Sequence, residues 1–265
     1  MAVSEIRELG TILSIWAHPD DEAYLCGGIM AMATAAQSRV VCVTATRGEL
    51  GVTDATRWPP EQLPAVRGAE LAECLRILGV TEHRWLGYPD GGCASVSLDI
   101  AAHQIAEIIR EIAPDTILTF APDGQTGHPD HIAVHRWTVE AVRRTGIGTL
   151  HVVANTQEWR DEHLARWTER GAIVGDPPVA WTGPLSIDLA LTRRLAGSQA
   201  CRAGSAGQPD PSVAGDRGRG ALSRDHPYRA FCHVHASTGG SFGARKPCYS
   251  SVICRSGKRR RRAER

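Results

Sequence analysis

Two short segments carry His and Asp residues at spacings that could do chemistry. They are AHPDDE at 17–22 and GHPDH at 127–131. Two imidazoles and one carboxylate can hold a catalytic divalent ion and still leave positions open to water and substrate. His18 and Asp21 lie three residues apart, so a turn that opens a helix could aim both at one point, with His131 arriving from the second segment. The pattern predicts one metal ion per chain, with Zn²⁺ expected first and Fe²⁺ as the alternative.

The other polar residues of the two segments could supply an acid and a base. Asp20 would then lie near the ion without coordinating it. A carboxylate there could take a proton from a water whose pKa the ion lowers towards ~7. A protonated His128 could stabilise an oxyanion or protonate a leaving amine, and Asp130 could hold its ring in position. The combination is typical of metal-assisted hydrolysis at a carbonyl.

A simpler interpretation of each His-Pro-Asp triplet is a turn. Proline fixes φ, and an Asp at this place caps the helix that follows. Capping alone would explain any one of Asp20, Asp21 or Asp130. It does not explain two such triplets, each after a candidate strand, and we therefore favour the metal site.

The elements that must position these segments alternate between strands and helices. An apolar run at 11–17 precedes a helical pattern through Ala36, and a β-branched run at 40–46 follows. Further candidates are a helix from Pro64 to Gly79, a strand near 84–87, a helix from Leu98 to Ile112, a strand at 116–121, a helix at 132–144 and a strand at 149–155. This order predicts an α/β fold with a mostly parallel sheet and helices on both faces. Ligands bind such sheets beyond the carboxyl ends of the strands, so the two segments would meet if 11–17 and 116–121 are neighbours.

Composition is that of a soluble globular protein. The chain has 265 residues, of which 42% are hydrophobic and 22% charged, and this excludes fibrous classes. No run approaches the ~18 apolar residues of a membrane span, so we expect a cytoplasmic protein without a membrane partner. The four N-terminal cysteines have no paired spacing and are expected to be small buried residues or reduced thiols: Cys26, Cys42, Cys74 and Cys93.

The last part of the chain differs from the rest. Residues 1–200 carry a net charge of −9 and residues 201–265 a net charge of +10, and all seven Trp lie in the first part. We expect one domain at 1–195 and a poorly patterned basic tail at 196–265. The tail could be disordered, a solvated Arg-rich run, or the product of a frameshift near 195–203, since 28 Arg against 2 Lys suggests a GC-rich gene. It lacks a nucleic-acid motif, so no specific nucleic-acid binding is expected.

The paired motifs resemble those of the LmbE-like or PIG-L family of metal-dependent N-acetylglucosaminide deacetylases, which includes the deacetylase and amidase of mycothiol metabolism. The segments 46–51, 67–80 and 86–91 also resemble family segments, and the resemblance covers roughly residues 10–195. It implies a Rossmann-like fold and hydrolysis of an acetamido sugar to an amine and acetate. It also implies a role for each site residue: metal ligands at His18, Asp21 and His131, the general base at Asp20, an acid or electrophile at His128 partnered by Asp130, and substrate contacts at Arg67 and Asp90.

Two departures concern the substrate and the C-terminal part. Thr126 stands where the mycothiol deacetylase carries a Tyr, and a His expected after Ile187 is missing, with Arg193 and Arg194 in the region of a family Lys. The expected function is a zinc-dependent hydrolase that deacetylates an N-acetylglucosamine conjugate or a related small amide. The alternatives are an amidase of a glucosaminyl thiol conjugate and a non-catalytic metal-binding protein with a nucleic-acid-binding tail.

Overall fold

The computed structural model describes residue 3 and residues 5–51, 59–169, 171–191, 235–237 and 249–256. Side chains are described up to residue 187. The proposed frameshift region at 195–203, the Arg193–Arg194 pair and most of the expected tail lie outside the described residues, so the division at residue 195 stays an expectation.

Five parallel strands form the part of the sheet that matters for the site. They are β1 (Ile12–Trp16), β2 (Val40–Thr44), β3 (Glu82–Trp85), β4 (Thr116–Thr119) and β5 (Thr149–Val152), in the spatial order β3-β2-β1-β4-β5. β1 is central, with Ile12 opposite Val40 of β2 and Thr116 of β4. Both β1 and β2 are buried along their whole length, which is why they appear in the sequence as continuous apolar runs. The expected α/β fold is confirmed.

Three further strands extend the sheet beyond β5. They are β7 (His235–Ser237), β8 (Tyr249–Ser256) and β6 (Leu185–Leu191), in that spatial order. β7 pairs antiparallel with both β5 and β8, and β6 pairs parallel with β8. Two of these strands, β7 and β8, lie within residues 196–265, where the sequence pattern predicts no helix or strand.

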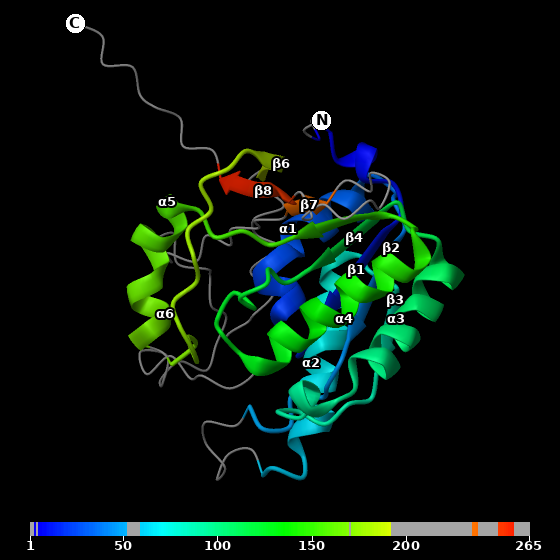
Figure 1. Ribbon diagram of the computed structural model, residues 1–265, viewed down its shortest axis with the longest axis vertical. Helices are drawn as coiled ribbons and strands as arrows, with labels where there is room; N and C mark the ends of the chain where they lie inside the picture. Colours follow the sequence, from blue (N-terminus) through cyan, green and yellow to red (C-terminus); the bar gives the residue numbers. More distant parts are fainter. Residues whose placement is uncertain are drawn as a thin grey trace, which may run out of the picture.

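The main helices are α1 (Asp21–Ala35), α2 (Leu63–Leu78), α3 (Leu98–Ile112) and α4 (Pro129–Thr145). The chain runs from β1 through β2 to β3 and then crosses back to β4, and α1 packs against α2 and α3 against α4. Right-handed crossovers, the rule for parallel strands, would place the two helix pairs on opposite faces of the sheet. Figure 1 shows α3 and α4 side by side along the sheet. Shorter helical turns are η1 (Ile6–Leu9), η2 (Cys93–Ser95), α5 (Gln157–Trp159), the π-helical turn η3 (Arg160–Leu164) and α6 (Ala165–Glu169). None of the described helices is long and apolar enough to cross a membrane.

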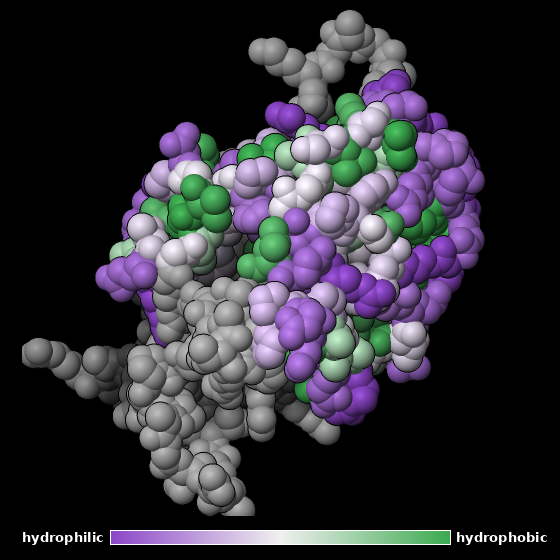
Figure 2. All heavy atoms as spheres, turned by 90° about the horizontal axis from the view of Figure 1, so that it is seen from below, coloured by the Kyte–Doolittle hydropathy of each residue, from purple (hydrophilic) through white to green (hydrophobic). Residues whose placement is uncertain are grey.

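The core lies between the sheet and these helices. Trp16, Phe120 and Trp137 are at most 2% exposed, and the first two rings meet edge to face with centroids 5.1 Å apart. The four N-terminal cysteines are buried thiols, as expected. The outer surface is mostly polar where it is described, and Figure 2 shows hydrophilic side chains spread over the helical part with smaller apolar areas between them.

Element boundaries differ from the sequence expectations in ways that bear on the site. Strands β4 and β5 end two and three residues earlier than their apolar runs. α4 begins at Pro129 instead of 132, because proline suits the first helical position and the His128 side chain caps the helix by accepting a hydrogen bond from the Asp130 backbone N–H. The second motif therefore forms the first turn of α4.

Candidate active site

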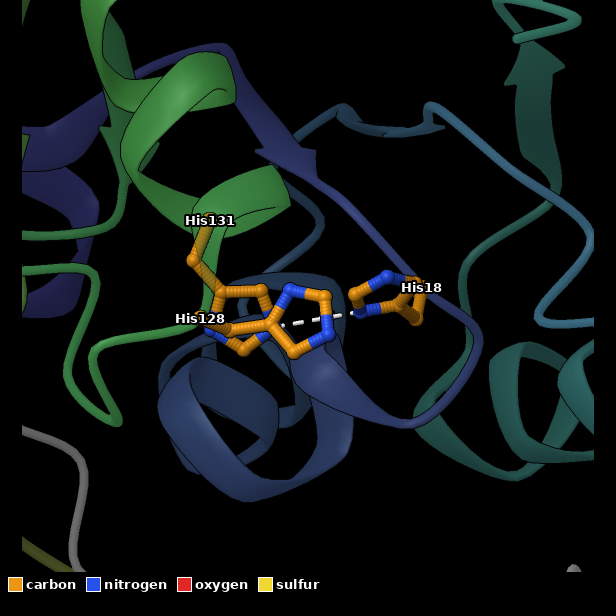
Figure 3. Close-up of side chains that lie close together, drawn as sticks. All are labelled: His18, His128 and His131. Carbon is orange, nitrogen blue, oxygen red and sulfur yellow. Dashed lines mark hydrogen bonds between the residues drawn. The ribbon is translucent and has the colours of Figure 1, made fainter. Parts of the chain in front are cut away.

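The two motifs lie at the point where the strand order reverses. AHPDDE links β1 to α1 and GHPDH opens α4 after β4, and β1 and β4 are parallel neighbours. Loops from neighbouring parallel strands meet at the carboxyl edge of the sheet. Figure 3 shows the three imidazoles gathered there, with His18 from the β1–α1 loop facing His128 and His131 at the start of α4.

Three side chains form a compact set of metal-ligand atoms. His18 Nδ1 lies 3.1 Å from His131 Nε2, and Asp21 places one carboxylate oxygen 3.6 Å from the former and the other 3.4 Å from the latter. Tetrahedral bonds of about 2.0–2.2 Å would separate ligand atoms by about 3.4 Å. The donor set therefore fits a divalent ion. Two further groups of described residues bring one ligand atom each within 4.8 Å of one another: His18, His128 and His131, and His18, Asp90 and Asp130.

The His131 ring is fixed by contacts on its other nitrogen and on its face. Nδ1 lies 2.8 Å from the carbonyl oxygen of Gly124, and the Thr126 hydroxyl lies 3.2 Å from the same atom. Phe120 stacks on the ring at 4.2 Å with an interplanar angle of 15°. With its proton on Nδ1 donated to the carbonyl, His131 presents an unprotonated Nε2 to the ligand set. Thr126, noted as the departure from the mycothiol deacetylase, thus contacts this ring.

His18 is fixed by two carboxylates on the side away from the ligand set. Its Nε2 lies 3.0 Å from Asp90 Oδ1 and 3.3 Å from Asp130 Oδ2. Asp130 is fully buried and also accepts hydrogen bonds from the backbone N–H groups of Gly91 and Cys93. With one proton on Nε2 held by these carboxylates, Nδ1 can bind a metal once it has released its own proton, which is the usual arrangement around a metal-ligating histidine.

The structure corrects the expected pairing of Asp130 with His128. The Asp130 carboxylate contacts His18, and only the backbone N–H of Asp130 reaches the His128 ring, donating to Nδ1 at 3.2 Å. The sequence suggested the other pairing because the two residues are neighbours, but the first turn of α4 points the carboxylate towards β1. His128 is half-buried, with ring centroids 4.8 Å from His18 and 5.0 Å from His131.

Asp20 lies at the edge of the ligand set in an unusual backbone conformation. Its φ is 110°, and its carboxylate accepts a hydrogen bond of 2.7 Å from Arg67, whose guanidinium also donates to the Pro19 carbonyl. The Asp20 side chain is 38% exposed, whereas that of Arg67 is only 7% exposed. Arg67 and Asp90 are the two expected substrate contacts. In the structure Arg67 bonds the candidate base Asp20, and Asp90 contacts His18.

Two contacts at the site were not expected from the sequence, although both residues stand in segments that had been noted. Glu22, the last residue of AHPDDE, is buried and accepts a hydrogen bond of 3.0 Å from the Asp20 backbone N–H. Glu49, in the segment 46–51, accepts one of 2.8 Å from the Asp90 backbone N–H. Their position inside these segments is the signal in the sequence that could have identified them. Their carboxyl groups fix the backbone of Asp20 and Asp90.

The surroundings of the site move the pKa values of His18 and His131 in opposite directions. Burial lowers the pKa of His18, but hydrogen bonds to Asp130 and Asp90 and the nearby Asp21 charge outweigh it and raise that pKa to about 10. Burial lowers the pKa of His131 to about 3, with the His18 charge acting in the same direction. Burial and the charges of His18 and His131 also lower the pKa of His128.

The pKa values of the Asp20 and Asp90 carboxyl groups also move in opposite directions. Desolvation raises the pKa of Asp20 to about 6, opposed by the Arg67 cation and assisted by the Asp21 charge. For Asp90, desolvation is outweighed by the hydrogen bond to His18 and its charge, and the pKa falls to about 2. A carboxylate with a pKa near 6 is still ionised at neutral pH and is a stronger proton acceptor than an ordinary one.

Comparison with known proteins identifies the family. The profile of the PIG-L family, described as GlcNAc-PI de-N-acetylase, matches residues 13–142. A 1D-myo-inositol 2-acetamido-2-deoxy-α-D-glucopyranoside deacetylase from Saccharomonospora viridis is 31% identical over 207 residues, which cover 69% of this chain and 77% of the relative. The chain belongs to the PIG-L family. The family expected from the two motifs is confirmed.

A second relative shows how much of the length is shared. The protein of the same name from Kineococcus radiotolerans is 38% identical over 217 residues, covering 66% of this chain and 59% of the relative. This PIG-L chain thus spans less than two thirds of that protein.

Solved structures share the fold. An N,N'-diacetylchitobiose deacetylase from Pyrococcus horikoshii matches with a TM-score of 0.50 at 21% identity, over 66% of this chain and 75% of that one. A teicoplanin deacetylase in a zinc-inhibited form matches with a TM-score of 0.54 at 17% identity, over 71% and 80%. A 4-carboxy-2-hydroxymuconate hydratase from Pseudomonas putida matches with a TM-score of 0.51 at 17% identity, over 74% and 80%. Because a hydratase shares the fold, the reaction has to be argued from the site residues.

Proposed function

We propose that this PIG-L chain is a metal-dependent hydrolase that removes the acetyl group from an N-acetylglucosamine conjugate. The observation that carries the proposal is the close approach of His18 Nδ1, His131 Nε2 and the two carboxylate oxygens of Asp21, with His128 beside the two imidazoles. The names of the two curated relatives support an acetamido sugar as the substrate class.

The ligand set supports a divalent ion held by two imidazoles and one carboxylate. Zn²⁺ is our first choice, and Fe²⁺ suits the same donors. The ion would supply Lewis acidity to the amide carbonyl and would make a water easier to deprotonate. His18 would bind through Nδ1 and His131 through Nε2, because hydrogen bonds occupy their other nitrogens.

Asp20 is our candidate for the general base. Its carboxylate is partly exposed beside the ligand set, and a pKa near 6 leaves it ionised at neutral pH and able to accept a proton from water. Arg67 holds the carboxylate through one hydrogen bond. The Glu22 carboxylate holds the backbone of the same residue. Asp20 therefore needs little rearrangement before it accepts a proton.

His128 is our candidate for the group that protonates the leaving amine. Its Nδ1 accepts the hydrogen bond from the Asp130 backbone N–H, so a proton available for donation is on Nε2. Its pKa is lowered by burial and by neighbouring positive charge, which makes the protonated ring a stronger acid. Breaking the amide C–N bond then gives acetate and the free amine of the sugar.

The test is acetate release from 1D-myo-inositol 2-acetamido-2-deoxy-α-D-glucopyranoside and from simpler N-acetylglucosamine conjugates, with Zn²⁺ added and with a chelator. We expect turnover that the chelator abolishes. Replacing Asp20 by Ala should lower kcat by about 10²–10⁴-fold, because the base is lost while the metal ligands remain.

Asp99→Ala is the matched control. Asp99 is an exposed carboxylate on α3, and its loss should leave the rate unchanged. Metal content of the Asp20→Ala variant, measured on the same sample, should stay at one ion per chain. Chelator-insensitive turnover, or a wild-type chain that binds no metal, would rule out the proposed mechanism.

A further inference from the structure

A cavity lies beyond the carboxyl ends of β4 and β5, against the β4–α4 loop that also leads to the candidate active site. Its volume is about 230 Å³. Its walls come from the β4–α4 loop at 121–125, from the end of β5 and the residues after it at 152–155, and from the segment 179–181. The roles proposed above use no residue of these walls.

The cavity walls are mostly apolar and are tied together by hydrogen bonds. Alanine, valine and proline side chains make up most of the lining, with Trp181 on one side. The Trp181 backbone N–H donates to the Asn155 carbonyl at 2.7 Å, and the Val179 backbone N–H donates to the Asp123 carboxylate at 3.2 Å. These bonds hold the segment 179–181 against the ends of both strands.

The Gln125 side chain places a polar group in the wall of this cavity. Gln125 is 2% exposed, and its side-chain carbonyl accepts a hydrogen bond from the Ala121 backbone N–H. Its Nε2 has no hydrogen-bond partner among the described residues. A buried amide donor without an acceptor is costly, so the cavity offers a binding position for an acceptor atom within an apolar surround.

The position of the β4–α4 loop indicates which part of a substrate would reach the cavity. Gln125 and His128 stand three residues apart in the loop between β4 and α4, so their Cα atoms lie at most about 11 Å apart. His128 is the proposed acid for the leaving amine, and that amine carries the sugar. The sugar and the group attached to it therefore lie towards this loop, and the base Asp20 lies on the β1 side.

We infer that the cavity is a subsite for the aglycone of the substrate, and that it selects an apolar ring bearing a hydrogen-bond acceptor over a polyhydroxylated ring. This inference rests on the proposed deacetylase function and names its substrate class more narrowly. The apolar lining disfavours an inositol, whose hydroxyl groups would lose water there with one donor to replace it. An aryl group with a carbonyl substituent matches both the walls and Gln125 Nε2.

The test compares kcat/KM for four α-glycosides of 2-acetamido-2-deoxyglucose, with methyl, phenyl, 4-acetylphenyl and 1D-myo-inositol aglycones. We expect the phenyl glycoside to exceed the methyl and inositol glycosides by about tenfold or more, mainly through KM, because apolar burial contributes equally to substrate and transition-state binding. The 4-acetylphenyl glycoside should exceed the phenyl glycoside further.

Two variants and a control locate the effect. Ala180→Phe, at a half-buried wall position, should fill the cavity and lower the phenyl-to-methyl ratio about tenfold. Gln125→Met should remove the advantage of 4-acetylphenyl over phenyl. Ile100→Phe, at a 63% exposed position of α3 outside the cavity, should leave both ratios as in the wild type.

The outcomes separate this inference from the function on which it rests. Turnover of the methyl glycoside with no preference for aryl aglycones, or an Ala180→Phe variant that lowers all four rates equally, overturns the subsite and leaves the deacetylase intact. No turnover of any of the four removes the proposed function, and the subsite falls with it.

Discussion

The Asp20 carboxylate is subject to opposing influences that set the pH range in which it can act as a base. Desolvation and the Asp21 charge raise its pKa, and the Arg67 cation, 2.7 Å away, lowers it. A base must be unprotonated to accept a proton. The rising limb of the pH profile should therefore follow the pKa of Asp20, near 6, and the loss of the proton from the proposed acid His128 should give the falling limb.

Replacing Arg67 by Met should move this rise to higher pH. The change removes the cation that lowers the pKa of Asp20, so the pKa increases and the base is protonated over a wider range. The measurement is kcat/KM of acetate release from about pH 5 to pH 9. Arg84→Met, which breaks a surface ion pair with Glu111, is the control and should leave the profile in place. A profile that stays in place or moves to lower pH in the Arg67 variant would exclude Asp20 as the group that titrates.

At the scale of elements, the turn before α4 determines where His131 lies. Gly124 has φ +68°, and its carbonyl accepts the hydrogen bond from His131. A Cβ at Gly124 would lie 2.9 Å from the Cβ of His131. Gly146, at the other end of α4, has a similar φ of +64° but nothing within 4 Å of its Cβ position. The two glycines have a similar backbone conformation, but only Gly124 lies against a residue of the site.

Gly124→Ala and Gly146→Ala therefore form a matched pair. Gly146→Ala should lower the free energy of unfolding by about 1–2 kcal/mol, because an alanine in the left-handed region is strained, and Gly124→Ala should lower it further, because its Cβ also meets His131. Only Gly124→Ala should also displace the His131 ring and weaken zinc binding, by about tenfold or more, since losing the support of a metal ligand has effects of this size. Calorimetric titration with Zn²⁺ and thermal unfolding measure the two effects. Equal zinc affinities in the two variants would contradict the role given to the Gly124 turn.

The sequence predicts the helices and buried strands well because each leaves a local pattern. β1 and β2 are continuous apolar runs, α2 ends at the glycine that the pattern suggested, and α4 ends one residue beyond its expected end. β3 is half-buried along its length and was placed two residues late, because it has no such run. The pairing of Asp130 with His18 could not be predicted, because it depends on how the first turn of α4 faces β1 across 112 residues of sequence.

At the scale of the whole molecule, the site and the C-terminal strands are separate parts of one sheet. The proposed site residues lie between His18 and His131, and their contacts described above stay within that range. β7 and β8 add to the far side of β5, and β8 is the strand that pairs with β6. Ile187 of β6 is fully buried in the core and pairs with Val3, near the start of the chain, through a parallel bridge.

Ending the chain at Gly197 should therefore separate catalysis from the C-terminal segment. The shortened chain keeps every proposed site residue, so zinc affinity and acetate release should stay within about threefold of the full chain, since distant sites act nearly independently. Its melting temperature should fall by about 3 °C or more, because β5 and β6 lose their partners β7 and β8. Binding to DNA, if the full chain has any, should vanish, because residues 1–197 carry a net charge of −9 and the basic residues are removed. A shortened chain that folds but no longer binds zinc would show that the C-terminal segment completes the site. One that keeps DNA binding would contradict an electrostatic origin of that binding in the tail.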